Sequence, residues 1–149
     1  MKNLFLLVAL LGLFELNLKA QDTIYEKRRG NDNWKTYGKC ENGFLFKKKA
    51  FSQSWQLVGK YEGGNIFLKK HKKNDWLLIG KYEDGFIFQK RNRKDKWDII
   101  GKYHDNLVYQ KGRRKDQWSV VGKCKNNPFG AAFLLLLNEE DNNSFILII

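Results

Sequence analysis

The amino-acid sequence predicts an all-β protein made of five β-hairpins. Three observations predict this fold class: a 21-residue repeat, short strand-like runs in every copy, and a turn dipeptide at one fixed position of the repeat. Self-similarity at a constant spacing is the signature of a repeat architecture. All tryptophans of the chain belong to this repeat: Trp34, Trp55, Trp76, Trp97 and Trp118. A Gly-Lys pair begins four residues after each of them.

The first twenty residues have the features of a secretory signal peptide. Lys2 precedes an apolar run from Leu4 to Phe14, and a short polar stretch ends at Ala20, the expected cleavage site. The run is shorter than the ~20 residues that a membrane-spanning helix needs. A buried N-terminal helix is the alternative. We therefore expect an exported protein in the periplasm, at the cell surface or outside the cell, with no transmembrane helix in the mature chain.

Residues 21–127 are expected to form the five-repeat domain. Runs rich in Ile, Phe, Tyr and Trp, such as 86–90 and 97–103, are typical of strands. A dipeptide that tolerates positive φ recurs at one phase of the repeat, as a two-residue type I′ hairpin turn requires. The five dipeptides are Asn42-Gly43, Gly63-Gly64, Asp84-Gly85, Asp105-Asn106 and Asn126-Asn127. The product is a ten-stranded antiparallel meander.

The turn at 84–85 sets the register of its hairpin. It pairs Tyr82 with Ile87, and strand alternation then places Trp76, Leu78, Gly80 and Tyr82 on one face, which we predict to be the main core. Each Trp stays on that face only if the longer connection, around 92–96, has an odd length of about three or five residues.

The two ends of this meander differ in charge. The tight turns carry Glu and Asp, whereas the longer connections gather basic residues onto one rim. With a net charge of +12, such a rim predicts attraction to anions, and simply solvated loops are the alternative. The candidate ligand-binding residues are Arg28, Arg29, Lys49, Lys70, Lys72, Lys73, Arg91, Arg93, Lys94, Arg113, Arg114 and Lys115.

Basic residues are also expected next to the tryptophans. In an unbroken register Arg91 lies across from Trp97, and matching pairs are Arg28 with Trp34, Lys49 with Trp55, and Lys70 with Trp76. A stack of such pairs could bind sugar rings, bases or an anionic polymer. The interpretation we favour makes Trp a core residue whose edge is covered by the aliphatic stem of Arg or Lys.

The two cysteines bear on whether the repeats close. Cys40 and Cys124 are the only cysteines, and an even number in an exported protein favours a disulfide. In a flat row of hairpins they lie roughly 38 Å apart, because neighbouring strands are about 4.8 Å apart, whereas a disulfide needs Cα atoms within about 7 Å. The bond therefore requires a curled or closed, barrel-like arrangement. The alternative is an open single-layer hairpin solenoid with free thiols or an intermolecular bridge.

Residues 128–149 are expected to form an apolar C-terminal cap. Asn127 and Pro128 suit the N-cap and first position of a short helix through the apolar run 129–137. A strand is the alternative for that run, and a final strand is expected at 145–149. The cap covers core or a strand edge, or serves as a membrane or partner anchor.

No catalytic, cofactor or metal pattern occurs in the sequence. His71 and His104 fall at opposite ends of the meander, and we find no phosphate-binding loop and no zinc or calcium motif. We expect a protein that is not an enzyme and needs no cofactor.

The hairpin unit, with its Trp, its Gly-Lys-Tyr segment and its Asn-Gly or Asp-Gly turns, resembles the hairpin-repeat proteins of the MORN and YwqK type over residues 24–124. The Trp-to-turn spacing is longer here. The resemblance implies a β-hairpin array used as a scaffold and assigns no functional residue. The Lys-Ala and Gln-Asp residues around the cleavage site resemble those of exported Bacteroidetes-like proteins.

The expected function is binding of an anionic polymer or surface through the basic rim, such as lipopolysaccharide, an acidic glycan or nucleic acid. The alternative is a structural or protein-interaction scaffold in the envelope.

Overall fold

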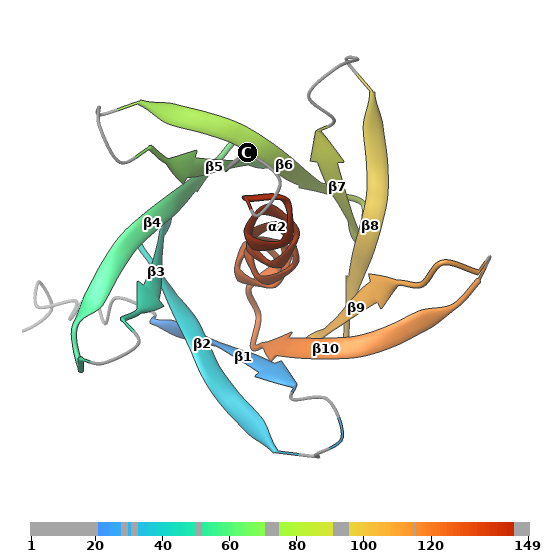
Figure 1. Ribbon diagram of the computed structural model, residues 1–149, viewed down its shortest axis with the longest axis horizontal. Helices are drawn as coiled ribbons and strands as arrows, with labels where there is room; N and C mark the ends of the chain where they lie inside the picture. The colour runs from blue at the N-terminus through green and yellow to red at the C-terminus, as the bar shows by residue number, and fades with distance from the viewer. Residues whose placement is uncertain are drawn as a thin grey trace, which may run out of the picture.

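The repeats close into a ten-stranded antiparallel barrel with a helix along its centre (Figure 1). The computed structural model describes residues 21–27, 30, 33–49, 52–70, 75–90, 96–114 and 116–144, with side chains described as far as residue 137. The expected signal peptide and final strand lie outside these residues. The elements are β1 (Asp22–Lys27), β2 (Trp34–Glu41), β3 (Phe44–Lys48), β4 (Trp55–Glu62), β5 (Asn65–Lys69), β6 (Trp76–Glu83), β7 (Phe86–Lys90), β8 (Trp97–His104), β9 (Leu107–Lys111), β10 (Trp118–Cys124) and α2 (Pro128–Ser144).

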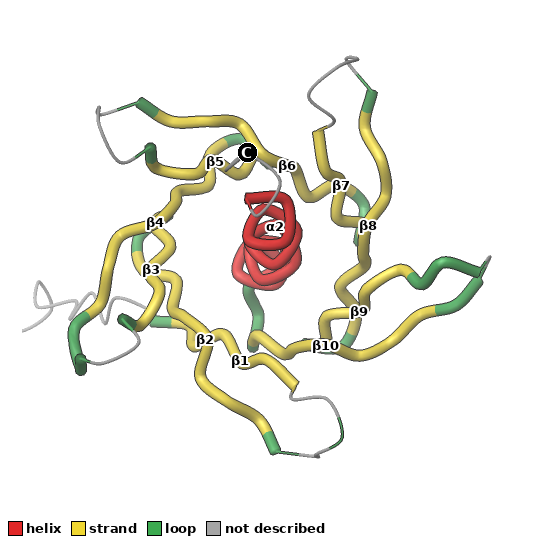
Figure 2. The backbone as a smooth tube through the Cα atoms, viewed as in Figure 1, coloured by secondary structure: helices red, strands yellow, loops and turns green. Residues whose placement is uncertain are grey.

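Each strand pairs with its neighbours in sequence, and β1 pairs with β10 to close the ring. This confirms the predicted curled, closed meander and excludes the open row. A closed sheet leaves no long unpaired edge for aggregation. The strands form five hairpins that splay outward from the barrel (Figure 2). We call them arms 1 to 5: β1–β2, β3–β4, β5–β6, β7–β8 and β9–β10.

Tight turns connect one arm to the next. At 42–43, 63–64, 84–85 and 105–106 both central residues have positive φ, for example 49° at Asp84 and 84° at Gly85. These values and the pairing of Tyr82 with Ile87 confirm the predicted turns and their register. The fifth dipeptide, Asn126-Asn127, is not a hairpin turn: Asn126 has positive φ, but the chain then begins α2.

A β-bulge in every arm changes the predicted faces. In arm 3, Ile66 pairs with Gly80 but Phe67 pairs with Leu78, so Ile79 is left without a partner in the ladder. The extra residue moves Trp76 to the face opposite Gly80. The prediction that Trp76 and Leu78 share the core face with Gly80 and Tyr82 is therefore wrong for Trp76 and Leu78, which lie in the outer half of the arm. The bulges fall at one phase of the repeat: Tyr37, Val58, Ile79, Ile100 and Val121.

The bulge also corrects the predicted loop length. Six residues, 70–75, separate β5 from β6, and the other arms have loops of the same length. We predicted an odd number because an unbroken strand keeps its alternation. The bulge adds one residue inside the strand, so the loop itself has an even number of residues.

The core consists of α2 and the inner wall of the barrel. Side chains from Ala131 to Leu137 are buried all round the helix, as are Ile24, Leu45, Ile66, Ile87 and Val108 of the wall. A helix that is apolar on every side is stable in water only when it is enclosed. Burial of a Leu or Phe side chain contributes about 2 kcal/mol. The run 129–137 thus lies in a helix, as predicted, but this helix is the centre of the core and not a cap on it.

Glycines make room for this helix. A Cβ atom at Gly59 would lie 2.8 Å from Phe133 Cε2 of α2 and 2.8 Å from the backbone oxygen of Phe67. Gly80, Gly101 and Gly122 face Leu136, Leu135 and Leu134 in the same way. The repeated glycine therefore sets the distance between the wall and the helix.

The start of α2 is fixed by hydrogen bonds to both sides. The Asn127 side chain accepts from the backbone N–H of Gly130 at 3.0 Å, which confirms its predicted N-cap role, and it donates to Asp22 of β1 at 3.0 Å. Pro128 follows at the first helical position, where its missing N–H costs nothing. The helix is thereby joined to the seam where β1 meets β10.

Candidate functional site: the outer ends of five arms

The outer end of every arm has a lysine directly across from its tryptophan. Lys69 pairs with Trp76 in arm 3, one residue earlier than the unbroken register predicts for Lys70. The bulge causes this shift. The complete set is Lys27 with Trp34, Lys48 with Trp55, Lys69 with Trp76, Lys90 with Trp97, and Lys111 with Trp118. Sequence reasoning saw these lysines only as members of basic runs.

Backbone hydrogen bonds close the loops beyond these pairs. The N–H of Lys49 donates to Ser54 at 3.2 Å, that of Lys70 to Asp75 at 3.1 Å, and that of Gly112 to Gln117 at 2.8 Å. The same position of the repeat is used in all three arms. One backbone hydrogen bond thus closes each of these three loops at its base, and the described basic residues there, Lys49, Lys70, Arg113 and Arg114, are exposed.

Four of the twelve predicted site residues lie in the described part of the chain. Lys49, Lys70, Arg113 and Arg114 are all exposed at arm ends, and none forms an ion pair with another described residue. The structure brings them to arms 2, 3 and 5, at the ends far from the barrel axis (Figure 2). The other eight lie outside the described residues: Arg28, Arg29, Lys72, Lys73, Arg91, Arg93, Lys94 and Lys115.

A second set of lysines has a structural role. The Nζ atom of Lys60, from arm 2, lies 5.3 Å from the ring centroids of both Phe67 and Trp76 in arm 3. Each such cation–π contact contributes about 0.5–1 kcal/mol at a partly exposed site. The arrangement repeats at Lys39, Lys81, Lys102 and Lys123, the last reaching Tyr25 and Trp34 of arm 1. A ring of contacts thus joins each arm to the next and closes with the barrel.

This ring corrects the predicted role of the tryptophans. They do not belong to the main core but lie half-buried on the outer wall, with Trp55 36% exposed. Each holds the lysine that follows the inward-facing glycine of the preceding arm. In the Gly-Lys pair of the repeat, the glycine therefore faces the inside of the barrel and the lysine contacts the aromatic rings on the outer wall.

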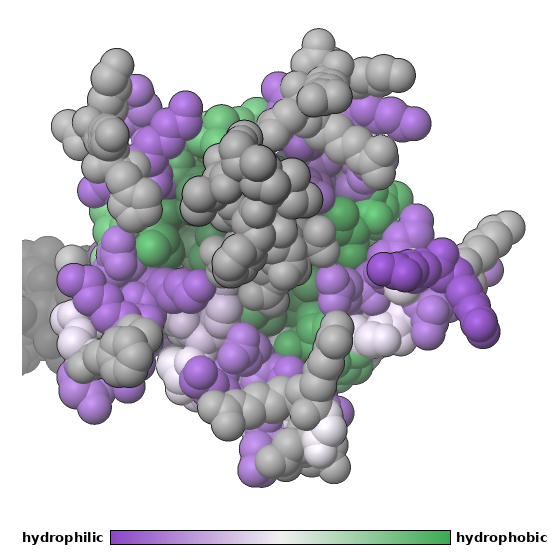
Figure 3. Space-filling view, in the orientation of Figure 1, coloured by the Kyte–Doolittle hydropathy of each residue, from purple (hydrophilic) through white to green (hydrophobic). Residues whose placement is uncertain are grey.

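Acidic groups neutralise the same lysines near the tight turns. Lys39 forms an ion pair with Glu41 at 3.1 Å, and Lys60 forms one with Glu62 at 3.1 Å. Lys81 and Glu83 pair likewise. Three of the five ring lysines are thus paired with a carboxylate, whereas Lys49, Lys70, Arg113 and Arg114 at the arm ends have no ion pair with a described residue. Figure 3 shows hydrophilic residues over the arms and hydrophobic surface between them.

The two cysteines lie together where α2 begins. A Cβ at Gly130 would lie 2.7 Å from Cys40 Sγ and 2.9 Å from Cys124 Sγ. Both side chains are buried, and the hydrogen bond with Cys124, followed by burial, raises the pKa of Cys40. Their proximity agrees with the predicted closure, but the expected disulfide is not formed: both are free thiols.

The strand order explains why the thiols are close without being bonded. Cys40 pairs with Asp22 and Cys124 pairs with Ile24, on opposite sides of β1. Two strand spacings amount to about 9.6 Å in a flat sheet, more than the roughly 7 Å between Cα atoms that a disulfide tolerates. At this phase the other arms have tyrosines, and Tyr61 stacks on Phe129 with centroids 4.4 Å apart. The smaller cysteines leave the space that the start of α2 occupies.

Other chemistry is sparse in the described residues. They contain no cluster of three or more His, Cys, Asp or Glu side chains able to hold a metal ion. No helix among them is long and apolar enough to cross a membrane. Comparisons with protein-family models, curated proteins and solved structures find no match to this chain.

Proposed function

We propose that this protein is an exported, non-enzymatic binding protein whose cationic arm ends attach it to an anionic polymer or surface, such as lipopolysaccharide, an acidic glycan or nucleic acid. The observation that carries the proposal is the separation of charge along arms 2, 3 and 5, whose ends include described basic residues. Lysines near the barrel are held by rings and carboxylates, whereas Lys49, Lys70, Arg113 and Arg114 are exposed at the far ends.

The spacing of the arms supports several simultaneous contacts. Five arms radiate from one rigid barrel, so an extended polyanion can meet more than one of them (Figure 1). Linked contacts gain affinity through effective concentration without any new type of interaction. Repulsion among the arm ends is relieved when anions bind between them.

Charge reversal at the described arm residues tests the proposal. Near an anionic surface each Lys or Arg contributes about 1 kcal/mol, so changing Lys49, Lys70, Arg113 and Arg114 together to Glu should weaken binding about a thousand-fold. The probes are heparin and vesicles that contain phosphatidylserine. Binding of the unmodified protein should also fall steeply between low and physiological salt.

A single-site pair provides the matched control. Lys49→Glu changes an arm end, whereas Lys125→Glu makes the same change in net charge at an exposed position of the opposite, turn end. The first should weaken binding about five-fold and the second much less. Equal effects would mean that only net charge matters, and unchanged heparin retention in the fourfold variant would refute the proposal.

A protein-interaction scaffold is the second candidate. Phe44 and Phe86 are 40% and 38% exposed on the outer wall, and exposed aromatic residues are common in protein interfaces. Binding through this surface should survive high salt and the arm substitutions, and it should be lost in the Phe44→Ser/Phe86→Ser variant.

A further inference from the structure

Arm 3 differs from the other four arms on the side of the wall that faces α2. Leu68 pairs with Gly59 in one direction and with Leu77 in the other. Paired positions share a face of the sheet, and Gly59 faces Phe133 of α2, so both leucines continue the helix-facing side outward. Ile79 is buried in the core, Leu68 packs against the core, and Leu77 is 38% exposed. We call Leu68, Leu77 and Ile79 the apolar strip of arm 3.

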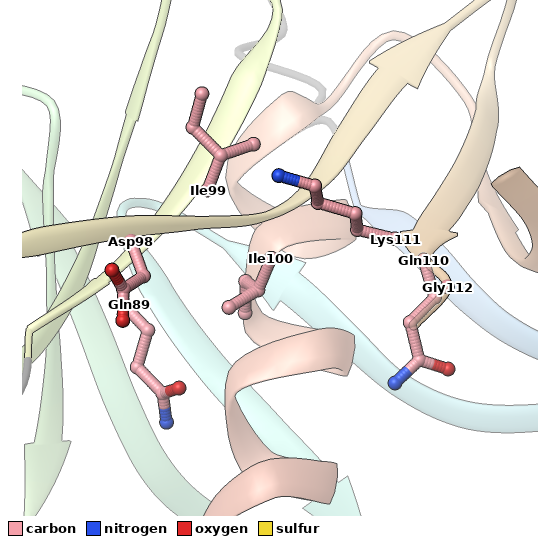
Figure 4. Close-up of a pocket in the computed structure, with 7 residues that line it drawn as sticks. All are labelled: Gln89, Asp98, Ile99, Ile100, Gln110, Lys111 and Gly112. Atoms are coloured by element: carbon pink, nitrogen blue, oxygen red, sulfur yellow. The ribbon is translucent and has the colours of Figure 1, made fainter. Parts of the chain in front are cut away.

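The repeat shows that the hairpin does not require an apolar pair at this place. Every other arm has two polar residues there, and Figure 4 shows one such pair, Gln89 and Asp98 of arm 4. The four polar pairs are Glu26 with Lys35, Lys47 with Gln56, Gln89 with Asp98, and Gln110 with Ser119. Arm 3 thus has apolar surface leading out of the core where the other arms have polar groups.

The chain has an apolar segment that begins close to this strip. Residues 145–149, Phe-Ile-Leu-Ile-Ile, directly follow α2. The seven residues of α2 between Leu137 and this segment are all polar, so the buried part of the helix ends before the segment begins. An uncharged run of this kind is prone to aggregation when it is exposed. Contact between the segment and the strip would remove apolar surface of both from water.

The direction of α2 brings the segment to the side of arm 3. Leu136 faces Gly80 of β6. Seven residues are close to two turns of an α-helix, so the backbone at Asn143 lies above Leu136, on the side of arm 3. The helix end is about 10 Å beyond Leu136, and Leu77 is about 10 Å beyond Gly80 along β6. Five extended residues span up to about 17 Å, which is enough to reach Leu77.

We propose that residues 145–149 of this chain dock on the apolar strip of arm 3. The docked segment ties the end of α2 to one arm and covers the leucine pair that the other arms replace with polar residues. This contact lies within the protein and does not depend on anion binding at the arm ends.

Cysteine cross-linking in the full chain tests where the segment lies. The Leu77→Cys/Leu147→Cys variant is compared with Asp98→Cys/Leu147→Cys and Gln56→Cys/Leu147→Cys, which place the first cysteine at the equivalent position of arms 4 and 2. The two native cysteines are buried. After mild oxidation, peptide mass spectrometry should find the bond within one molecule at least about five-fold more often in the arm 3 variant, because docking raises the effective concentration. Equal yields, or no bond in any variant, would overturn the proposal. A bond between two molecules would assign the strip to a second copy and overturn it as well.

A truncation combined with a substitution copied from arm 4 tests the same contact without cross-linking. Ending the chain at Ser144 should raise the unfolding equilibrium constant about ten-fold, because apolar side chains lose their contact. In the Leu68→Gln/Leu77→Asp background, with the pair that arm 4 accommodates, the same truncation should change it by less than about two-fold. Ser119→Asp, the equivalent change in arm 5, is the control background and should leave the ten-fold effect unaltered. Equal truncation effects in the three backgrounds, or no effect in the unmodified protein, would contradict the docking.

Discussion

Replacement of Gly59 by alanine tests the contact between the barrel wall and the central helix. The added Cβ would lie 2.8 Å from Phe133 Cε2 and 2.8 Å from the Phe67 carbonyl oxygen. The backbone oxygen belongs to the ladder and cannot move without breaking it. Overpacking of this kind costs about 1–3 kcal/mol. In a protein of this size, ~2 kcal/mol corresponds to a fall of roughly 8 °C in Tm.

The sign of the change in unfolding free energy caused by Gly59→Ala is informative as well as its size. Gly59 does not have positive φ, and at an open position Gly→Ala stabilises by about 0.4–1 kcal/mol because it restricts the unfolded chain. Urea unfolding followed by tryptophan fluorescence measures the change. A neutral or stabilising effect of Gly59→Ala would refute the packing of this glycine against α2.

Two further variants identify the source of the effect. Phe133→Leu in the Gly59→Ala background should recover part of the loss, with a coupling of at least about 0.5 kcal/mol in a double-mutant cycle. Gly112→Ala is the control, because the atoms nearest to its Cβ would all belong to the flexible Gln117 side chain, with Oε1 at 2.7 Å and Cδ and Cγ at 2.9 Å. Its effect should stay within about 0.5 kcal/mol.

Three other predictions follow from the core, the cysteine pair and the outer ring. A chain ending at Asn127 loses α2 and should show no cooperative urea transition, whereas a folded truncated barrel would contradict the role of the helix. Cys40 has a raised pKa in the folded state, so above the unfolded pKa of about 8.5 only the unfolded chain ionises and stability falls as pH rises. Between pH 8 and pH 10 this loss should reach about 2 kcal/mol, and Cys40→Ala should abolish that part of the pH dependence. Lys60→Met should destabilise by about 1 kcal/mol through the lost contacts with Phe67 and Trp76, whereas Lys125→Met, at an exposed turn, should change unfolding little.

Closure of the ring was predicted from a disulfide between Cys40 and Cys124, which is not formed, so that outcome was right for a reason that was wrong. The sequence was sufficient to predict the strands and four of the five tight turns. These depend on local φ requirements and on a repeat phase that can be counted. The N-cap at Asn127 and Pro128 was equally predictable because capping is decided by neighbouring residues.

The outer half of each arm could not be derived from strand alternation alone. A single bulge at Ile79 reverses the faces of everything before it and shifts the partner of Trp76 by one residue. A glycine inside a strand does indicate a bulge or a close backbone approach. Gly80 lies next to the bulge and also at a close backbone approach, so the glycine alone did not tell which of the two to expect.

The place of the C-terminal helix depends on the whole barrel. An eight-stranded barrel is just filled by its own side chains, and ten strands leave additional interior volume. The run 129–137, apolar on every side, is the segment able to occupy that volume. Gly59, Gly80, Gly101 and Gly122 leave room for the side chains of α2, so the fit of the helix depends on four repeats together.

Native-state hydrogen exchange tests most directly whether α2 is the centre of the core. If the helix fills the closed barrel, the amides from Ala132 to Leu137 can exchange only when the barrel opens. Their exchange free energy should then equal the free energy of global unfolding and depend on urea in the same way. Exchange of these amides at a much lower free energy, with little dependence on urea, would contradict a helix enclosed by the five arms.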